Sequence, residues 1–496
     1  MAGTDHDEHV EHDDPDHAVE HDDPVDPVDP VDTDHSVEHV DPNHAVDPVD
    51  PDGDDRDPAA SGAARGRGVA RHGRLRRRGP WRGLAAGVGL VAAVAVAGAT
   101  SLAAVATWQV LDGAPPPVSL AAPGATSSPP PALTAQSGEV TLLLVGSDTR
   151  EGQGVAYEDA ANQAASVGVG KNDSTVLVRI NADHTAMAVV SFPRDLLLPI
   201  PACTNDEGGV TPASSRAMLN TALERGGREH GLACVAATIG QLTGLQVDYA
   251  GSVEFDGVVA MADAVGGVEV CLATPLRDDD VDPALDLPAG TRVLTGSEAG
   301  SFLRSRHGVG DESDLARVSN QQTFLSALAR QTVSAGTLTD PAAVLRLATV
   351  AFDSMTLSDT LADPATLARM ALAIDTVGLD QMVFVTYPVV DDPSDPNRVV
   401  EATEPAAVLK AALQAGQPIE LAEDSLGRSA VLDPAAPVKP APPAAEQPGA
   451  PVGSTDPADP TATAPATAAP APLPAAELPS SVSGQSADQV TCAAKG

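Results

Sequence analysis

A stretch of 28 residues without a single charged side chain divides this 496-residue chain into two parts. It runs from Gly83 to Val110, and a helix of that length would measure about 42 Å, enough to cross a bilayer core of about 30 Å. Trp81 and Trp108 lie near its two ends, where amphipathic rings prefer the membrane interface. Residues 61–82, just before it, hold eight arginines and no acid. We therefore predict one transmembrane helix, with a cytoplasmic N-terminus by the positive-inside rule.

A cleaved signal peptide is the alternative interpretation of this stretch, because Ala-rich segments can offer cleavage sites. Signal peptides, however, normally start near the first residue, and their apolar region is shorter than the one found here. The uncleaved anchor is therefore the interpretation that we prefer. It places everything after Val110 outside the cell membrane.

The first 60 residues are strongly acidic, with 22 Asp or Glu and one Arg, and they repeat HDDP and VDP units. Repelling charges and frequent prolines exclude a packed core, so we predict a disordered cytoplasmic tail at 1–60 and a basic juxtamembrane segment at 61–82. Eight of the twelve histidines lie in this tail, and metal binding is a second interpretation of them. The formal net charge of the chain is −40, which argues against binding of nucleic acid.

Two further segments have the composition of spacers. Residues 111–137 are rich in Pro, Ala, Ser and Gly and predict a linker, and residues 423–480 predict an extended Pro/Ala-rich tail. Residues 481–496 form a last segment that contains Cys492.

Short apolar runs alternate with helical spacing over residues 138–422, which predicts an extracellular α/β domain. We expect a single α-β-α sandwich with a central mixed sheet. The predicted strands are Glu139–Gly146, Ser174–Ile180, Met187–Phe192, Val268–Leu272 and Gln381–Tyr387. The predicted helices are Arg216–Glu224, Gly231–Thr243, Phe255–Ala264, Glu298–Arg304 and Ser313–Ser334.

The chain has four cysteines, an even number that favours disulfides in an exported segment. Cys203 and Cys234 flank one loop-helix unit, and we predict that they pair. Cys271 and Cys492 are then left by elimination. No paired Cys/His spacing of a zinc site occurs.

Charged side chains follow or open several of the predicted strands and helices. Loops beyond the strand ends of an open α/β sheet converge on its ligand crevice, so we expect these side chains to meet there. They are Asp148, Lys171, Asp173, Arg194, Arg304, Arg306, Asp314, Arg317 and Gln321.

The residue types in this set favour a diphosphate site. Arginine binds phosphate oxygens with a planar fork, and aspartate supplies the hard oxygen ligands that Mg²⁺ prefers. Taken singly, each has a plainer interpretation, because an Asp after a strand is commonly a turn or N-cap residue. Asp314 and Arg317 are three residues apart, which is also the spacing of an ordinary ion pair on the surface of a helix.

At these residues the sequence resembles the LytR-CpsA-Psr family of bacterial envelope proteins, in its actinobacterial form. The matching stretches are collinear over about 180 residues, and the last of them is long and specific. They are LLLVGSDTR (Leu142–Arg150), NDSTVLVRI (Asn172–Ile180), SFPRD (Ser191–Asp195), VEFDGVVAMADAVGGVEV (Val253–Val270) and FLRSRHGVGDESDLARVSNQQTFL (Phe302–Leu325).

The resemblance implies a Mg²⁺-dependent phosphotransferase that moves a glycopolymer from a polyprenyl-pyrophosphate carrier onto peptidoglycan, outside the membrane. It implies that Asp148 and Asp173 act on Mg²⁺, and that Asp314 orients the arginines or serves as base. It also implies an apolar groove for the prenyl chain, lined by helices between Leu219 and Val258. The pyrophosphate would be held by Arg194, Arg304, Arg306, Arg317 and Gln321.

Two positions depart from the family pattern. The family often has Arg two residues before the second Asp, where this chain has Lys171, a point charge rather than a fork. A basic residue often precedes the helix near Leu219, and here Arg216 is the nearest cation.

Two other functions are consistent with the same residues. A pyrophosphatase acting on polyprenyl pyrophosphate would differ only in using water as acceptor. A lipid-binding or regulatory envelope module would use the groove without turnover. A purely structural wall tether is disfavoured, since a tether needs no metal site.

Overall fold

The computed structural model describes residues 115–121, 129–134, 136–149, 168–334, 336–422, 424–436 and 473–495. The predicted acidic tail, basic segment and transmembrane helix lie outside these residues, as does most of the Pro/Ala-rich tail. Within the described ranges, no helix is both long enough and apolar enough to cross a membrane.

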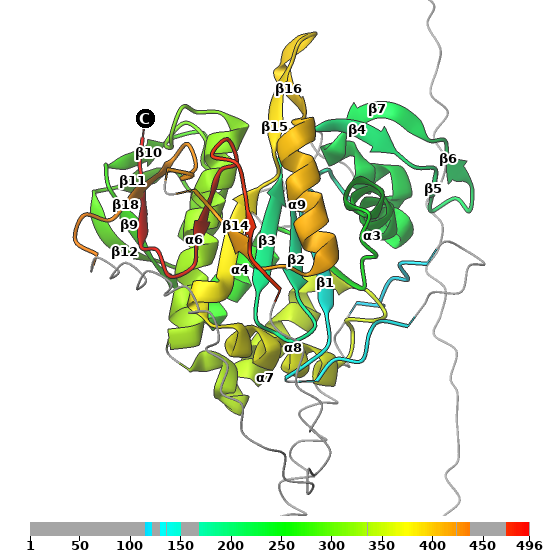
Figure 1. The fold of residues 1–496 in the computed structure, drawn as a ribbon, viewed down its shortest axis with the longest axis horizontal. Coiled ribbons are helices and arrows are strands. Elements are labelled where there is room, and N and C mark those ends of the chain that lie inside the picture. The colour runs from blue at the N-terminus through cyan, green and yellow to red at the C-terminus, as the bar shows by residue number, and fades with distance from the viewer. Residues whose placement is uncertain are drawn as a thin grey trace, which may run out of the picture. The chain divides into compact units, whose positions relative to one another are not determined.

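A mixed seven-stranded sheet in the order β13-β8-β1-β2-β3-β14-β20 forms the centre of the described chain (Figure 1). β1, β2 and β3 pair antiparallel, while β8 runs parallel to β1 and β14 runs parallel to β3. This confirms the predicted mixed sheet. Its strands are β1 (Val140–Ser147), β2 (Asn172–Ile180), β3 (Met187–Phe192), β8 (Tyr249–Val253), β13 (Met355–Leu357), β14 (Met382–Thr386) and β20 (Gly484–Ser486).

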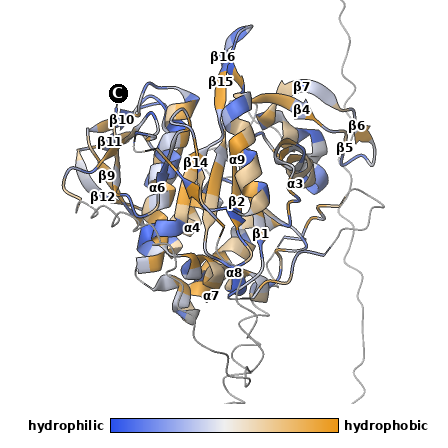
Figure 2. Ribbon diagram, viewed as in Figure 1, coloured by the Kyte–Doolittle hydropathy of each residue, from blue (hydrophilic) through white to orange (hydrophobic). Residues whose placement is uncertain are grey.

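Helices cover both faces of this sheet, because neighbouring residues of its strands point to opposite sides. Leu143 packs in one apolar cluster with α3 (Ala222–Thr243) and α9 (Thr403–Ala415). Leu142 packs in the other with α7 (Pro341–Ser354) and α8 (Pro364–Val377). Figure 2 shows the apolar strands lying between helices that carry polar residues on their outer sides.

A second sheet, β12-β9-β21-β18, packs against α5 (Gly296–Arg304) and α6 (Asp314–Ser334). Phe302 of α5 and Phe324 of α6 lie in the apolar cluster beneath it, with their rings 6.2 Å apart. The strands of this sheet are β9 (Val268–Leu272), β12 (Gly290–Leu294), β18 (Ala430–Leu432) and β21 (Thr491–Ala493). The segment after the Pro/Ala-rich stretch thus supplies strands to both sheets, although the sequence analysis set it apart from the domain.

Besides three short 3-10 helices, at Leu219–Thr221, Thr337–Thr339 and Leu379–Gln381, the other described elements are short strands and one more α-helix. They are β4 (Leu197–Ile200), β5 (Cys203–Thr204), β6 (Val210–Thr211), β7 (Ser214–Met218), α4 (Phe255–Ala264), β10 (Leu276–Asp278), β11 (Leu285–Leu287), β15 (Val389–Asp392), β16 (Asp395–Glu401), β17 (Ile419–Glu420) and β19 (Ala476–Glu477). Hairpin β15–β16 projects at the top of Figure 1.

The predicted helix Arg216–Glu224 is wrong in its first half. Ala217 and Met218 pair with β4 as part of strand β7, and helix α3 starts only at Ala222. Pairing between strands separated in sequence here overrides local helical spacing. Helices α7, α8 and α9 were not among the predicted helices. The N-termini of α7 and α8 carry a recognisable signal, Asp340-Pro341 and Asp363-Pro364, an N-cap Asp followed by a Pro in the first turn.

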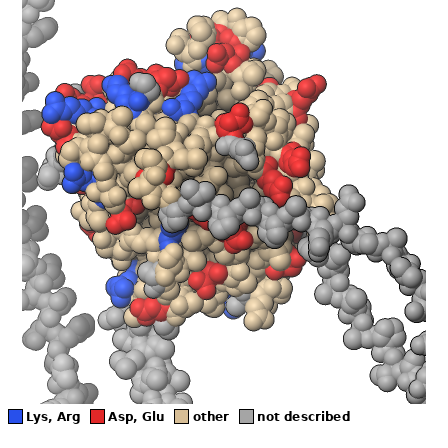
Figure 3. Space-filling view, turned by 60° about the vertical axis from the view of Figure 1, so that its left-hand side comes forward, with Lys and Arg blue, Asp and Glu red and all other residues tan. Residues whose placement is uncertain are grey.

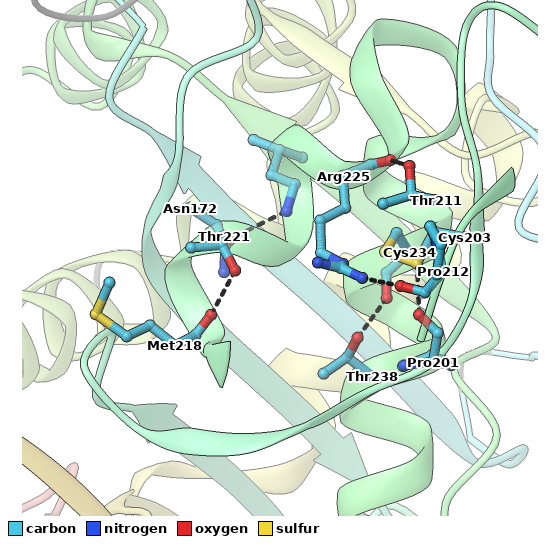
Figure 4. Close-up of a disulfide and its surroundings, with 11 residues drawn as sticks. Asn172, Pro201, Cys203, Thr211, Pro212, Met218, Thr221, Arg225, Cys234 and Thr238 are labelled. Carbon is cyan, nitrogen blue, oxygen red and sulfur yellow. Dashed lines mark hydrogen bonds between the residues drawn. A yellow bond between two sulfur atoms is a disulfide. The ribbon is translucent and has the colours of Figure 1, made fainter. Parts of the chain in front are cut away.

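Both predicted cysteine pairs are joined. Cys203 of β5 is bonded to Cys234 of α3, with 5.5 Å between their Cα atoms (Figure 4). Cys271 of β9 is bonded to Cys492 of β21, directly across the two strands. The first bridge ties the β5–β6 excursion to α3, and the second ties the last described segment to the small sheet.

Candidate functional site

Strands β1, β2 and β3 bring the predicted acidic and basic residues to one end of the central sheet. β1 ends where β2 begins, because the two strands are antiparallel, and β3 ends beside the same point. Asp148 follows β1, Asp173 is the second residue of β2, and Arg194 and Asp195 follow β3. The sheet topology alone therefore gathers these four side chains.

A β-bulge sets the direction of Asp173. Gly146 pairs with Ser174 and Ser147 pairs with Asn172, so Asp173 is the extra residue between them. The Asn172 side chain turns toward α3, where its Oδ1 accepts from the Leu223 backbone N–H at 3.1 Å. Asp173 turns toward Arg194, whose Nη1 donates to both of its carboxylate oxygens at 2.7 and 2.9 Å.

Helix α6 supplies the other wall with side chains from one of its faces. Asp314, Arg317 and Gln321 follow one another at helical spacing. Arg317 donates from Nη2 to Asp314 Oδ1 at 2.7 Å and to the Asp173 backbone carbonyl at 2.9 Å. Gln321 donates to Ser174 Oγ at 3.1 Å, which fixes the helix against β2.

The side chains of Asp173, Arg194, Arg306, Asp314 and Arg317 form one group, which we call the arginine cluster. Its centre is Asp314 Oδ1, which lies 2.7 Å from Arg317 Nη2, 3.3 Å from Arg306 Nη2 and 3.6 Å from Arg194 Nε. Three guanidinium groups face two carboxylates within the cluster, and Asp195 and Arg398 add one charge of each sign at its edge, with Asp195 Oδ2 3.8 Å from Arg194 Nε. Counted together, four guanidinium groups face three carboxylates, which leaves a surplus of one positive charge that an anion would neutralise.

The pKa values in and beside the cluster shift in both directions. Burial lowers the pKa of Arg194, but the charges of Asp173, Asp314 and Asp195 outweigh it and the pKa is raised. Burial lowers the pKa of Arg306, and the charges of Arg317 and Arg194 lower it further, which shows that cations crowd this guanidinium. Burial and the Asp314 charge raise the pKa of Asp195, against the opposing effect of Arg194.

Two buried atoms of the cluster have no hydrogen-bond partner among the described residues. They are Arg194 Nε, a donor, and Asp314 Oδ2, an acceptor. Buried polar atoms are normally satisfied, so an unsatisfied donor and acceptor in one charged group need an explanation, and a ligand in the adjoining cleft would supply one. The donor suits a phosphate oxygen, and the acceptor suits a hydroxyl group.

The cluster opens into a cleft of about 600 Å³. Arg194 and Asp195 line one side, Arg306 and Asp314 line another, and hairpin β15–β16 lines a third with Asn397, Arg398 and Val399. Figure 3 shows charged side chains of both signs gathered along the upper edge of the face that it presents.

The sequence analysis missed Arg398 and Arg428, which also line the cleft. Arg398 Nη1 lies 3.6 Å from Asp195 Oδ1, and Arg428 donates to Asp311 at 2.8 Å. The polar residues around Pro396 predict a turn. No local sequence pattern predicts that this turn lies beside the site.

Four predicted site residues lie outside the cluster: Asp148, Lys171, Arg304 and Gln321. Arg304 donates to the backbone carbonyls of Asp282 and Gly300, at 2.5 and 3.3 Å, and to Ser301 Oγ at 3.4 Å. Lys171 meets Asp148 through its backbone, donating from its N–H to Asp148 Oδ1 at 2.5 Å and accepting from the Asp148 N–H. Gln321 bonds Ser174 and the Leu303 carbonyl.

The donor chemistry at the strand ends suits Mg²⁺. Asp148 and Asp173 offer hard carboxylate oxygens next to a set of arginines, the combination in which Mg²⁺ is usually shared between protein and phosphate. A Cβ atom at Gly170 would lie 2.6 Å from Asp148 Oδ1, so this glycine leaves room for the carboxylate. The residue types fit the ion that the sequence predicts, but both Asp173 oxygens accept from Arg194 and Asp148 Oδ1 accepts from the Lys171 N–H, so an ion would compete with these bonds.

The predicted prenyl groove stays a prediction. Leu219, Leu223, Val235 and Ile239 are buried in the apolar cluster between α3 and the sheet. The apolar contribution to the described cleft comes from Met218, Leu315 and Val399.

Comparison with known proteins finds that the sequence is similar to one protein family and to several cell wall proteins. The sequence profile of the LytR_cpsA_psr family matches residues 120–414. Cell wall biosynthesis protein LcpA of Corynebacterium glutamicum is 31% identical over 270 residues, which cover 51% of each chain. Polyisoprenyl-teichoic acid–peptidoglycan teichoic acid transferase TagV of Bacillus subtilis is 25% identical over 172 residues, or 34% of this chain and 41% of TagV.

Among solved structures, TagT bound to LIIa-WTA aligns with a TM-score of 0.41 and 19% identity, covering 57% of this chain and 91% of that one. The chain spans about half the length of the curated relatives that it matches.

Proposed function

The chain belongs to the LytR_cpsA_psr family, and on that premise we propose that it is a membrane-anchored phosphotransferase that moves a glycopolymer from a polyprenyl-pyrophosphate carrier onto peptidoglycan outside the cell. The observation that carries the proposal is the arginine cluster, with its surplus positive charge and its two buried unpartnered atoms at the wall of the cleft. The names of the relatives TagV and LcpA, which refer to teichoic acid transfer and cell wall biosynthesis, support the same reaction class.

In this proposal the diphosphate lies in the cleft against the arginine cluster. Arg194 Nε would donate to a phosphate oxygen, and Arg306 and Arg317 would neutralise charge that develops on the leaving phosphate. Asp148 and Asp173 would hold Mg²⁺, which when bound would add further neutralisation of the diphosphate.

The two oxygens of Asp314 would have separate tasks. Oδ1 holds the guanidinium groups of Arg194, Arg306 and Arg317 in place. Oδ2 is the buried acceptor and would take the proton of a peptidoglycan hydroxyl. The hydroxyl oxygen then bonds to the sugar-side phosphorus, the bond from that phosphorus to the bridging oxygen breaks, and the polyprenyl phosphate leaves with the electron pair.

The test uses the full chain in detergent, a prenyl-pyrophosphate disaccharide donor and a peptidoglycan fragment as acceptor. We expect a phosphodiester-linked product by mass spectrometry, lost on chelation and restored by Mg²⁺. Arg306→Ala should lower kcat by about 10²–10³, the usual cost of one transition-state donor. Arg346→Ala, at an exposed arginine of α7, is the matched control.

The product identity separates the transferase from its alternatives. A phosphomonoester carrying oxygen from labelled water, with no acceptor adduct, would establish the pyrophosphatase instead. Binding of the donor without any product would leave a lipid-binding module. Full activity of Arg306→Ala would contradict the site assignment.

A further inference from the structure

Residues 484–493 of the last described segment run beside helix α6, first as edge strand β20 of the central sheet and then as β21 of the small sheet (Figure 1). Gln485 of β20 donates to the Gln322 carbonyl of α6 at 3.1 Å, and Arg330 of α6 donates to the carbonyls of Ala487 and Gln489 at 3.1 and 2.8 Å. The segment then enters the small sheet as β21, where the Cys271–Cys492 disulfide fixes it. The segment is therefore packed against α6, the helix that carries Asp314 and Arg317.

Beyond β21 the same segment reaches the loop that joins α5 to α6, residues 305–313. Ala494 accepts from the Gly310 backbone N–H at 2.9 Å. Lys495 Nζ donates to the His307 backbone carbonyl at 2.8 Å and lies 3.2 Å from Glu312 Oε1. One lysine therefore joins the two halves of the loop.

This loop is bounded by two members of the arginine cluster. Arg306 is its second residue, and Asp314 follows its last. On its inner side, buried Asp278 accepts from Ser305 Oγ at 2.7 Å and from the Arg306 N–H at 3.1 Å. The outer side is held by the contacts with Ala494 and Lys495.

The loop backbone also contains a conformation that needs external support. Glu312 has φ 64°, a left-handed value that side chains other than glycine rarely adopt. Such conformations persist where surrounding contacts determine them. The Glu312 side chain forms the ion pair with Lys495. This ion pair therefore holds the residue whose backbone is strained.

We propose that Lys495 is a positioning residue of the active site, which holds the 305–313 loop so that Arg306 meets the diphosphate. The kinetic test of this inference, a transferase assay, rests on the proposed function. The structural test, hydrogen exchange of the loop, rests only on the geometry. The inference implies that the segment after the Pro/Ala-rich stretch is required for turnover.

The kinetic test compares Lys495→Met with the wild-type full chain in the transferase assay. We expect kcat to fall by about ten- to a hundredfold, the scale of a small misplacement of a catalytic group, with KM for the donor changing less. Lys495→Arg should restore most of kcat, because a guanidinium also donates to a carbonyl and a carboxylate. The thermal midpoint should stay unchanged, since both members of the ion pair are about half exposed.

A double-mutant cycle separates positioning of Arg306 from any other effect. In an Arg306→Ala background the Lys495→Met change should have no further effect on kcat, because the group that it positions is gone. The matched control is Arg369→Ala, which removes an exposed ion pair with Asp363 on α8. Additive losses, or an unchanged kcat in Lys495→Met alone, would overturn the proposal.

Hydrogen exchange gives a readout that does not depend on activity. In Lys495→Met without substrate, the amides of residues 306–313 should exchange faster, while those of β2 keep their rates. Unchanged exchange in the loop would refute the positioning role even if the wild type proved inactive. Inactivity of the wild type with faster exchange in the variant would instead count against the proposed function only.

Discussion

Replacing Arg317 with methionine should destabilise the domain more than almost any other single change at the site. The Arg317 side chain is only 5% exposed, and its guanidinium makes two hydrogen bonds to Asp314 Oδ1, at 2.7 and 3.1 Å, and one to the Asp173 carbonyl at 2.9 Å. Methionine keeps much of the volume of the side chain and removes the charge.

The expected loss follows from what the substitution leaves behind. Breaking a buried ion pair by removing one member costs about 3–5 kcal/mol, because the other charge stays buried without compensation. Asp314 keeps Arg306 at 3.3 Å and Arg194 at 3.6 Å, so the lower end of this range applies. We therefore expect a loss of about 3 kcal/mol in the free energy of unfolding.

A second substitution gives the prediction its sharpest form. In Arg317→Met combined with Asp314→Asn, Arg194 and Arg306 lose the carboxylate that they share, and two partly buried guanidinium groups are left with less compensation. The double variant should therefore be less stable than Arg317→Met alone.

Urea unfolding of the full chain with intact disulfides, followed by far-ultraviolet circular dichroism, measures both quantities when the slopes agree. A loss below about 1 kcal/mol in the single variant would show that Asp314 does not depend on Arg317. A double variant as stable as Arg317→Met, or more stable, would show that Arg194 and Arg306 do not depend on Asp314.

The remaining predictions concern stability away from the cluster. Burial would raise the pKa of Asp278, but hydrogen bonds from Ser305, Asp280 and Arg306 outweigh this effect, and the pKa is lowered. The stability that Asp278 contributes should therefore be fully present above its unfolded pKa of about 4, and it should be lost as the pH falls through the lower pKa of the folded state. Asp278→Asn should therefore flatten the acid side of a plot of thermal midpoint against pH, and an unchanged acid side would contradict this assignment. Replacing Cys203 and Cys234 together by Ala should cost about 3–4 kcal/mol in urea unfolding, from the 31-residue separation that the bridge closes, whereas a loss below about 1 kcal/mol would mean that other contacts hold the β5–β6 excursion in place.

Local patterns in the sequence determine the strands of the central sheet. A strand covered on both faces must be apolar at nearly every position, so β1, β2 and β3 stand out as short apolar runs with sharp ends. The polar residues that close these runs are the ones that the structure brings together, as the gathering of Asp173 and Arg194 shows.

Only the tertiary structure decided how the site is completed. The bulge that turns Asp173 toward Arg194 depends on the pairing of β1 with β2, and β7 is a strand only because β4 lies beside it. Arg398 and Lys495 reach the site from segments about 200 residues away from Arg194 and Arg306, respectively. Contacts of that kind arise from the packing of whole layers, and no propensity within a short window of sequence encodes which distant segments will meet.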